Sequence, residues 1–220
     1  MFKSKSIIFI LLVIAICLIA FLSFVQSKQN KLANNLPEIS FGWKFPLSKF
    51  PLLTGQDLVA YSSLRAPGAT PSGFPVRLEI PEIGVNSAIE DAAITPDGRM
   101  DVPANSVDVA WFELGPKPGE TGSAVIGGHY GIENGAPFVF YKLDQLKVGD
   151  KVYIVNDKNQ TIAFQVRSIQ LFDQNADATP VFVSNDGLAH LNLITCEGIW
   201  NQVDGNYPLR RVVFTDMVPE

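Results

Sequence analysis

The chain has 220 residues, of which 47% are hydrophobic and 18% are charged, and its formal net charge is −5. This length predicts one domain with additional segments, and the apolar content excludes an intrinsically disordered chain. Its two cysteines and two histidines are too few for a disulfide scaffold or a zinc site built from thiolates. The acidic balance argues against a general nucleic-acid-binding protein, because such proteins carry a basic surface.

The N-terminal segment predicts a membrane anchor. Residues 7–25 form an apolar run in which Ser23 is the only polar residue. As a helix this run is roughly 28 Å long, close to the ~30 Å hydrocarbon core of a bilayer. Lys3 and Lys5 precede it, which predicts a cytoplasmic N-terminus and an extracytoplasmic remainder. The alternative is a cleaved signal peptide, but the run is longer than the apolar region of such peptides and no small-residue cleavage motif follows it.

Three regions are therefore expected: a cytoplasmic stub with a single-pass anchor (1–26), an extracytoplasmic linker (27–74) and a folded domain (75–220). Prolines punctuate the linker and exclude regular structure over much of it. Its five basic and two acidic residues give a net charge of +3, whereas ten basic and twenty acidic residues from position 75 onward give −10. The chain thus places a cationic linker beside an acidic domain.

The folded domain is predicted to be all-β. Apolar and polar residues alternate with a period of two, or β-branched residues cluster, over short runs bounded by turn residues. Strands are predicted at 76–80, 124–127, 152–155, 161–171, 191–195 and 210–215, and a hairpin turn at 156–160. The only helical pattern covers 138–146. Seven or eight strands with one short helix favour a closed barrel, which removes exposed sheet edges.

Cys196 is the only cysteine outside the predicted anchor, since the other, Cys17, lies within it. An unpaired extracytoplasmic cysteine is either buried and inert, paired between chains, or kept as a reactive thiol. Cys196 ends the predicted strand 191–195, where a sheet can hold a nucleophile while its sulfur faces the loops. A thiol needs a nearby base or cation to react at neutral pH, because the thiolate is the nucleophile.

Two further groups could supply that partner. His129 follows an apolar run and two glycines, and Arg210 and Arg211 begin the last predicted strand. A guanidinium keeps its charge and suits an oxyanion or a peptide carbonyl. Adjacent strand residues point to opposite faces, so only one of the two arginines can face the cysteine. The residues alone leave both Arg210 and Arg211 as candidates, while His190 is assigned a structural role.

The order of these segments resembles the sortases, which are membrane-anchored cysteine transpeptidases built on an eight-stranded barrel. The resemblance covers residues 75–217. It includes LNLITC (191–196), the upstream Gly-His pair, PVRLEIPEIGV (75–85), GPKPG (115–119) and FYKL (140–143) running into VGD (148–150). It is nearest to the class E/F sortases, with one departure: Pro208 follows Gly205-Asn206-Tyr207 where the class F pattern has arginine.

The resemblance implies a function and roles for individual residues. Cys196 would attack the Thr–Gly carbonyl of an LPXTG-like sorting signal, His129 would act as acid and base, and Arg210 would steady the oxyanion or position the signal. Thr195 and Gly128 would shape the substrate pocket. The acyl group would pass from a thioester on Cys196 to an envelope amine, either a peptidoglycan precursor or a pilin lysine.

No cofactor or metal is expected, because Glu113, Asp173 and Asp177 are scattered and form no ligand pattern. The expected partners are proteins with LPXTG-like signals, an envelope amine and, through residues 7–25, the cell membrane. Two alternatives remain open at this stage. One is a hydrolase of the same signals, and the other is a non-catalytic, membrane-anchored barrel that binds peptides and carries an inert Cys196.

Overall fold

The computed structural model describes residues 73–96, 98–203 and 205–218. The predicted anchor and linker, residues 1–74, therefore lie outside the described residues apart from the last two positions of the linker. Within the described residues no helix combines the length and apolar character needed to cross a membrane.

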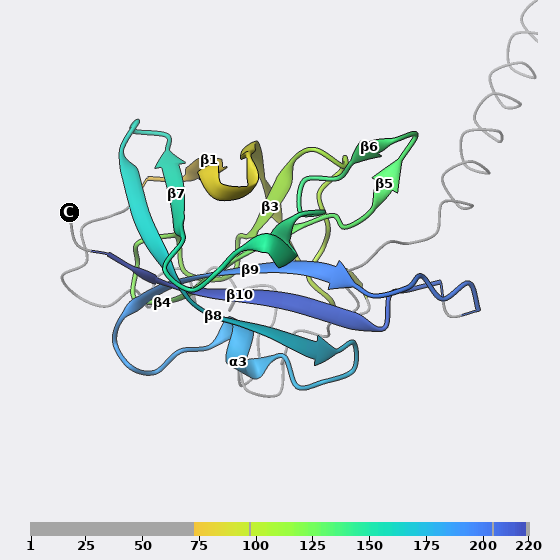
Figure 1. Cartoon of the computed structure of the whole chain (residues 1–220). Helices are drawn as coiled ribbons and strands as arrows, with labels where there is room; N and C mark the ends of the chain where they lie inside the picture. Colours follow the sequence, from red (N-terminus) through yellow and green to blue (C-terminus); the bar gives the residue numbers. More distant parts are fainter. Residues whose placement is uncertain (1–72, 97, 204, 219–220) are drawn as a thin grey trace, which may run out of the picture. The chain divides into compact units, whose positions relative to one another are not determined.

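Eight strands close into a barrel in the order β1-β2-β3-β4-β9-β10-β8-β7, and Figure 1 shows β9 and β10 of this barrel side by side. The strands are β1 (Pro75–Ile80), β2 (Val85–Ala92), β3 (Val109–Phe112), β4 (Gly122–Gly128), β7 (Lys151–Asn156), β8 (Thr161–Asp173), β9 (Ala189–Glu197) and β10 (Leu209–Met217). A two-stranded hairpin of β5 (Ile132–Glu133) and β6 (Ala136–Pro137) stands apart from the barrel sheet. The predicted all-β barrel is confirmed.

The three short helices lie between strands. They are η2 (Pro81–Ile83), η3 (Leu143–Gln145) and α3 (Thr179–Phe182). The helix predicted at 138–146 is wrong in extent, because only η3 forms there. The buried side chains of this stretch, Phe140, Leu143 and Leu146, recur every three residues. That spacing matches the three residues per turn of a 3₁₀ helix and not the 3.6 of an α-helix.

The barrel strands have two buried faces. The interior is filled by the inward-facing apolar side chains of the strands. They include Leu78, Ile126, Ile154, Leu193 and Val213. A second apolar cluster lies on the outer face of β4, β9 and β10, because side chains alternate between the two sides of a strand. This outer cluster contains Val125, Ile194, Cys196, Val212 and Phe214.

Two connections cover the outer cluster. The β2–β3 connection contributes Met100, and α3 in the β8–β9 connection contributes Val181 and Phe182. The ring of Phe182 packs edge-on against Phe112 of β3, with 5.3 Å between ring centroids. Among the strands, α3 lies mainly against β4. The outer face near Cys196 is therefore enclosed between the sheet and these connections.

The two buried faces predict a strong dependence of stability on the β9 side chains. Leu193 is fully buried in the barrel interior, whereas Leu171 of β8 is 51% exposed. We expect Leu193→Ala to lower the free energy of unfolding by about 2–5 kcal/mol through lost burial and a cavity. Leu171→Ala is the control, with an expected change within about 0.5 kcal/mol. Chemical denaturation measures both, and similar losses in the two variants would contradict the assignment of the core.

Candidate active site on strands β4, β9 and β10

Cys196 and Arg210 lie directly opposite each other on neighbouring strands. The antiparallel pairing of β9 with β10 joins Arg210 to Cys196 and Arg211 to Thr195. Directly opposite residues of an antiparallel pair project on the same side of the sheet, with Cβ atoms about 4.5–5.5 Å apart. Arg210 therefore faces the thiol, and Arg211 is directed to the other face.

His129 comes to the same level from the other side of β9. The strands β4 and β9 are parallel, and their last paired residues are Gly127 and Ile194. Continuing this register by two positions places His129, which directly follows β4, beside Cys196 and on the same face. The backbone positions of His129, Cys196 and Arg210 thus form one row across three adjacent strands.

The Cys196 thiol is almost completely enclosed, with 5% of the residue exposed, and it is a free cysteine. Burial raises the pKa of the Cys196 thiol, and the positive charge of Arg210 acts in the opposite direction. Burial penalises the thiolate because a charge loses its hydration in an apolar environment. The arginine is thus the group that favours the nucleophilic form of this cysteine.

Arg210 is fully buried and is held in place by the loop that precedes β10. Its Nη1 donates to the carbonyl oxygens of Tyr207 and Leu209, both at 2.8 Å. Its Nη2 donates to Oδ1 of Asn206, also at 2.8 Å. Burial lowers the pKa of Arg210, and the neighbouring Cys196 acts to raise it. Fixed donors of this kind can stabilise developing negative charge without reorganising.

Arg211 has a different partner, which separates its role from that of Arg210. Its Nε and Nη2 each donate to a carboxylate oxygen of Glu197 at 2.9 Å. This hydrogen bond raises the pKa of Arg211. A two-point pair with a carboxylate occupies the Nε–Nη2 edge of the guanidinium. Of the two arginines considered from the sequence, the structure brings Arg210 to the cysteine.

The ring of His129 is half-buried and oriented by two contacts. Its Nε2 lies 3.0 Å from the carbonyl oxygen of Pro103 in the β2–β3 connection. Because a carbonyl only accepts, Nε2 carries hydrogen in this arrangement, and Nδ1 is the acceptor of the neutral ring. The ring also packs edge-on against Phe138 with 6.2 Å between centroids.

Thr195 and Gly128, both predicted to shape the substrate pocket, are joined by a buried hydrogen bond. Thr195 is fully buried, and its Oγ1 donates to the carbonyl oxygen of Gly128 at 2.7 Å. A Cβ added at Gly128 would lie only 2.5 Å from the ring of Phe140. Gly128 therefore admits a core ring close to the backbone. This hydrogen bond joins the residue before Cys196 to the residue before His129.

Four aromatic residues beside this row were not identified from the sequence. Tyr207 packs against Tyr130 and Trp200, with ring centroids 5.6 and 5.1 Å away, and Tyr130 packs against Tyr141 at 5.8 Å. Burial and then the nearby Cys196 raise the pKa of Tyr207, which indicates that its ring lies close to the thiol. Their positions in three separate loops gave no periodic signal.

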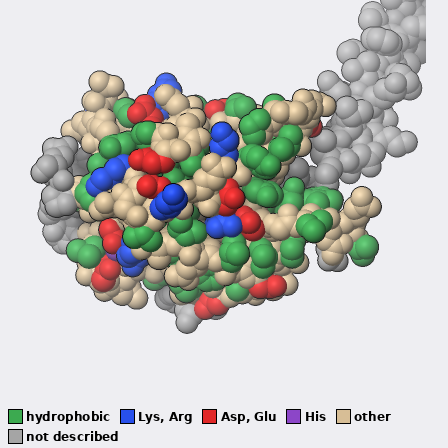
Figure 2. Space-filling model, in the orientation of Figure 1, with side chains coloured by type: hydrophobic (Ala, Val, Ile, Leu, Met, Phe, Trp, Pro, Cys, Tyr) green, Lys and Arg blue, Asp and Glu red, His purple; other side chains and the backbone are tan. Residues whose placement is uncertain are grey.

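The surface beside these aromatic residues is apolar. Ile132 in the β5–β6 hairpin and Ile199 and Val203 in the β9–β10 connection are all more than half exposed. Figure 2 shows hydrophobic side chains gathered toward the end of the domain from which this hairpin and this connection project. No group of three or more His, Cys, Asp or Glu side chains in the described part of the chain is arranged to hold a metal ion.

Comparison with known proteins identifies the family. Residues 78–218 match the model of the sortase domain. The chain belongs to the sortase family. No curated protein matches the chain, but solved structures of sortases do.

Sortase C-1 from Actinomyces oris aligns with a TM-score of 0.55 and 23% identity, over 89% of this chain and 97% of that one. Pilus-related sortase C of group B Streptococcus aligns with a TM-score of 0.51 and 25% identity, over 69% of this chain and 70% of that one. Sortase A from Corynebacterium diphtheriae aligns with a TM-score of 0.53 and 20% identity, over 76% and 70%. The barrel is thus the sortase fold, and its neighbours include sortases of more than one class.

The charge of Arg210 predicts the pH dependence of thiol reactivity in this sortase. Arg210→Gln removes the cation opposite Cys196, so we expect the pKa of the thiol to rise further. The pH midpoint of alkylation by iodoacetamide, followed at Cys196 by peptide mass spectrometry, should shift upward by about one unit. Arg210→Lys should retain most of the parent behaviour, and Arg211→Gln is the matched control on the other face. An unchanged midpoint in Arg210→Gln would contradict the electrostatic coupling.

The bond between Thr195 and Gly128 predicts a stability difference between two similar variants. Thr195→Val keeps the shape of the side chain but leaves a buried carbonyl without its donor, so unfolding should become easier by about 1–3 kcal/mol. Thr195→Ser retains the hydroxyl and should lose less. Urea denaturation compares the two, and equal stabilities of the serine and valine variants would show that the hydrogen bond contributes nothing.

Proposed function

We propose that this sortase is a cysteine transpeptidase that cleaves an LPXTG-like sorting signal between Thr and Gly and transfers the acyl group to an amine of the cell envelope. The observation that carries the proposal is the pairing of Cys196 with Arg210 across β9 and β10, with His129 directly after the neighbouring strand β4. Cys196 would be the nucleophile, His129 the acid and base, and Arg210 the group that stabilises the oxyanion or positions the peptide.

The first half of the reaction forms a thioester. The Cys196 thiolate attacks the threonine carbonyl carbon, and the charge that develops on the carbonyl oxygen is stabilised by the Arg210 guanidinium. The carbon–nitrogen bond then breaks, and protonated His129 gives its proton to the leaving glycine amine. The products of this half are an acyl-thioester on Cys196 and the released C-terminal fragment.

The second half reverses these roles. The acceptor amine attacks the thioester carbonyl, neutral His129 takes the proton of the attacking nitrogen, and the Cys196 thiolate leaves as the new amide forms. The Cys196 thiolate and protonated His129 are thereby regenerated. The enclosure of Cys196 supports amine transfer over hydrolysis, because a site that excludes water lengthens the life of a thioester.

The apolar surroundings of the row support binding of an extended peptide. Val181 and Phe182 of α3 lie in the same cluster as Cys196 and offer an apolar wall for side chains on the acyl side of the signal. Tyr207 and Trp200 offer a second wall from the β9–β10 connection. Aromatic and aliphatic walls with a few fixed polar groups are typical of sites that bind small or peptide substrates.

The cellular setting is part of the proposal. An anchor at residues 7–25 would hold the domain on the outer side of the cell membrane, where secreted proteins and envelope amines meet. The acceptor would be a peptidoglycan precursor or a pilin lysine, and the subclass would be nearest to E/F. The cationic linker, with a net charge of +3, is suited to an anionic envelope surface.

A peptide transfer assay tests this function. The full chain in a mild detergent is mixed with a peptide that contains an LPXTG-type motif, with and without triglycine as the amine. We expect a new amide that joins the threonine carboxyl to triglycine, together with an acyl-enzyme mass on Cys196. Cys196→Ala should abolish both products, and His129→Ala should lower the rate by about 100-fold or more because it removes the acid and base.

Three other outcomes would overturn the proposal in different ways. Cleavage without transfer would favour a hydrolase of the same signals. Binding of the peptide without cleavage, unchanged by Cys196→Ala, would favour a non-catalytic peptide-binding barrel. Transfer that survives Cys196→Ala would exclude the proposed nucleophile.

A further inference from the structure

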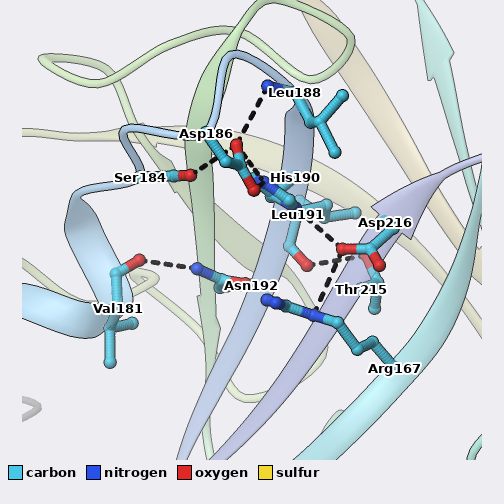
Figure 3. Close-up of polar contacts among 10 residues, drawn as sticks. All are labelled: Arg167, Val181, Ser184, Asp186, Leu188, His190, Leu191, Asn192, Thr215 and Asp216. Carbon is cyan, nitrogen blue, oxygen red and sulfur yellow. Dashed lines mark hydrogen bonds and ion pairs between the residues drawn. The ribbon is translucent and has the colours of Figure 1, made fainter.

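A charged network lies at the other end of β9, on the same face as Cys196. His190 is 3% exposed, and its Nδ1 lies 2.8 Å from Oδ1 of Asp216, its partner across the strands. Its Nε2 lies 3.0 Å from both carboxylate oxygens of Asp186. Figure 3 shows the ring of His190 between these two carboxylates. We refer to His190, Asp186 and Asp216 as the His190 clasp.

The hydrogen bonds of the clasp define its protonation. Ionised carboxylates only accept, so both ring nitrogens must donate, and His190 is a doubly protonated imidazolium in this arrangement. Asp186 faces the ring from the segment 183–188, Asp216 faces it from β10, and β4 places the uncharged Ser123 beside it. Arg167 of β8 pairs with Asp216 at 3.2 Å, so the group contains two cations and two anions.

Asp186 also organises the segment in which it lies. Its Oδ1 accepts from the backbone N–H of Leu188 and from the hydroxyl of Ser184, both at 2.9 Å. The bonds from Leu188, then those from His190 and Ser184, hold the pKa of Asp186 well below its usual range. The carboxylate therefore remains ionised at any pH near neutrality, and His190 is the group whose protonation can change the clasp.

The clasp lies next to residues 174–188, called the α3 cover here, which contribute Val181 and Phe182 to the apolar cluster that contains Cys196. The segment 183–188 joins α3 directly to β9. A second attachment comes from Asn192, whose Nδ2 donates to the carbonyl oxygen of Val181 at 2.6 Å. Val181 and Phe182 belong to the cluster that includes Cys196. Asn192 thus holds the middle of the cover, and the clasp holds the end that enters β9.

The distance along β9 excludes direct chemistry by His190. Six residues separate it from Cys196, which corresponds to roughly 20 Å along an extended strand. Any effect of His190 on the reaction must therefore act through the cover.

We propose that the His190 clasp positions the α3 cover for the transfer reaction, and that it does so only while His190 carries both ring protons. This inference rests on the proposed function for its link to peptide binding. A neutral ring has one donor and can serve only one of the two carboxylates. When His190 loses a proton, the bond to Asp186 or to Asp216 is lost, while Asn192 still binds the Val181 carbonyl and Gly122 still donates to the Leu188 carbonyl.

Hydrogen exchange tests the clasp without relying on activity. The full chain in detergent is labelled at about pH 5.5 and at about pH 8.5. Protection factors, corrected for the intrinsic exchange rate, are then compared for residues 174–188. We expect protection to fall about tenfold or more at the higher pH, because a charge-assisted hydrogen bond is lost. Protection of the β7 amides serves as the internal reference.

Two aspartate variants separate the clasp from a general charge effect. Asp186→Asn keeps the size of a half-exposed side chain but removes its charge, so protection of 174–188 should be low and independent of pH. Asp91→Asn, on the exposed side of β2, is the matched control and should retain the parent pH dependence. Equal protection of the parent at both pH values, or Asp186→Asn that behaves like Asp91→Asn, would overturn the proposal.

The kinetic test addresses positioning. In the transfer assay we expect KM of the parent for the peptide to rise with pH. Asp186→Asn should raise KM about fivefold or more at the lower pH and remove this dependence on pH. The effect on kcat should be smaller, because the cover binds the peptide and does not react. If exchange changes as expected but KM does not, the clasp holds the cover without positioning the peptide, and the proposal fails in that part. If the parent transfers no peptide, the proposed function fails, while the exchange result still decides whether the clasp exists.

Discussion

The site depends on one constraint, which is that β9 pairs with β4 on one side and with β10 on the other. The pairing fixes the register on both sides of Cys196, through Gly127 and Ile194 on one side and Arg210 on the other. A slip of one residue in either pair would turn the cysteine to the opposite face from its partner, since side chains alternate along a strand. Barrel closure makes such slips costly, because both faces of these strands are buried.

The enclosure of Cys196 has opposing physical effects. Burial raises the pKa of its thiol, which reduces the thiolate at neutral pH, while Arg210 favours that thiolate. The same burial keeps water from a thioester, which matters for a reaction that must choose an amine. The apolar cover that provides the burial is short, and it is fixed to the sheet by Asn192 and by the His190 clasp. The proposed chemistry at one end of β9 is thus linked to charge at the other end.

The fold was largely predictable because the strands obey simple rules. Alternation or β-branched clusters located β1, β4, β7, β8, β9 and β10. Neither β2 nor β3 was identified. β3 is buried along its length and such a strand shows no alternation, while the β2 sequence VNSAIEDA does not alternate strictly between apolar and polar residues. A helix was predicted over 138–146, but only η3 forms there. The apolar residues that suggested the helix include Phe140 and Leu143, which are three positions apart and both buried in the core. Periodicity in so short a stretch cannot distinguish the two helix types.

The sequence alone determined the chemical groups: one free thiol in the domain, one histidine after an apolar strand, and a pair of arginines at the start of the last strand. It also showed that only one of the two arginines can face the cysteine, because adjacent residues of a strand point to opposite faces of the sheet. Only the tertiary structure decided that Arg210 faces Cys196, that Thr195 and Gly128 are joined by a buried hydrogen bond, and that His190 lies between two carboxylates. The reason is physical, because register, burial and the approach of separate loops depend on contacts between residues far apart in the chain.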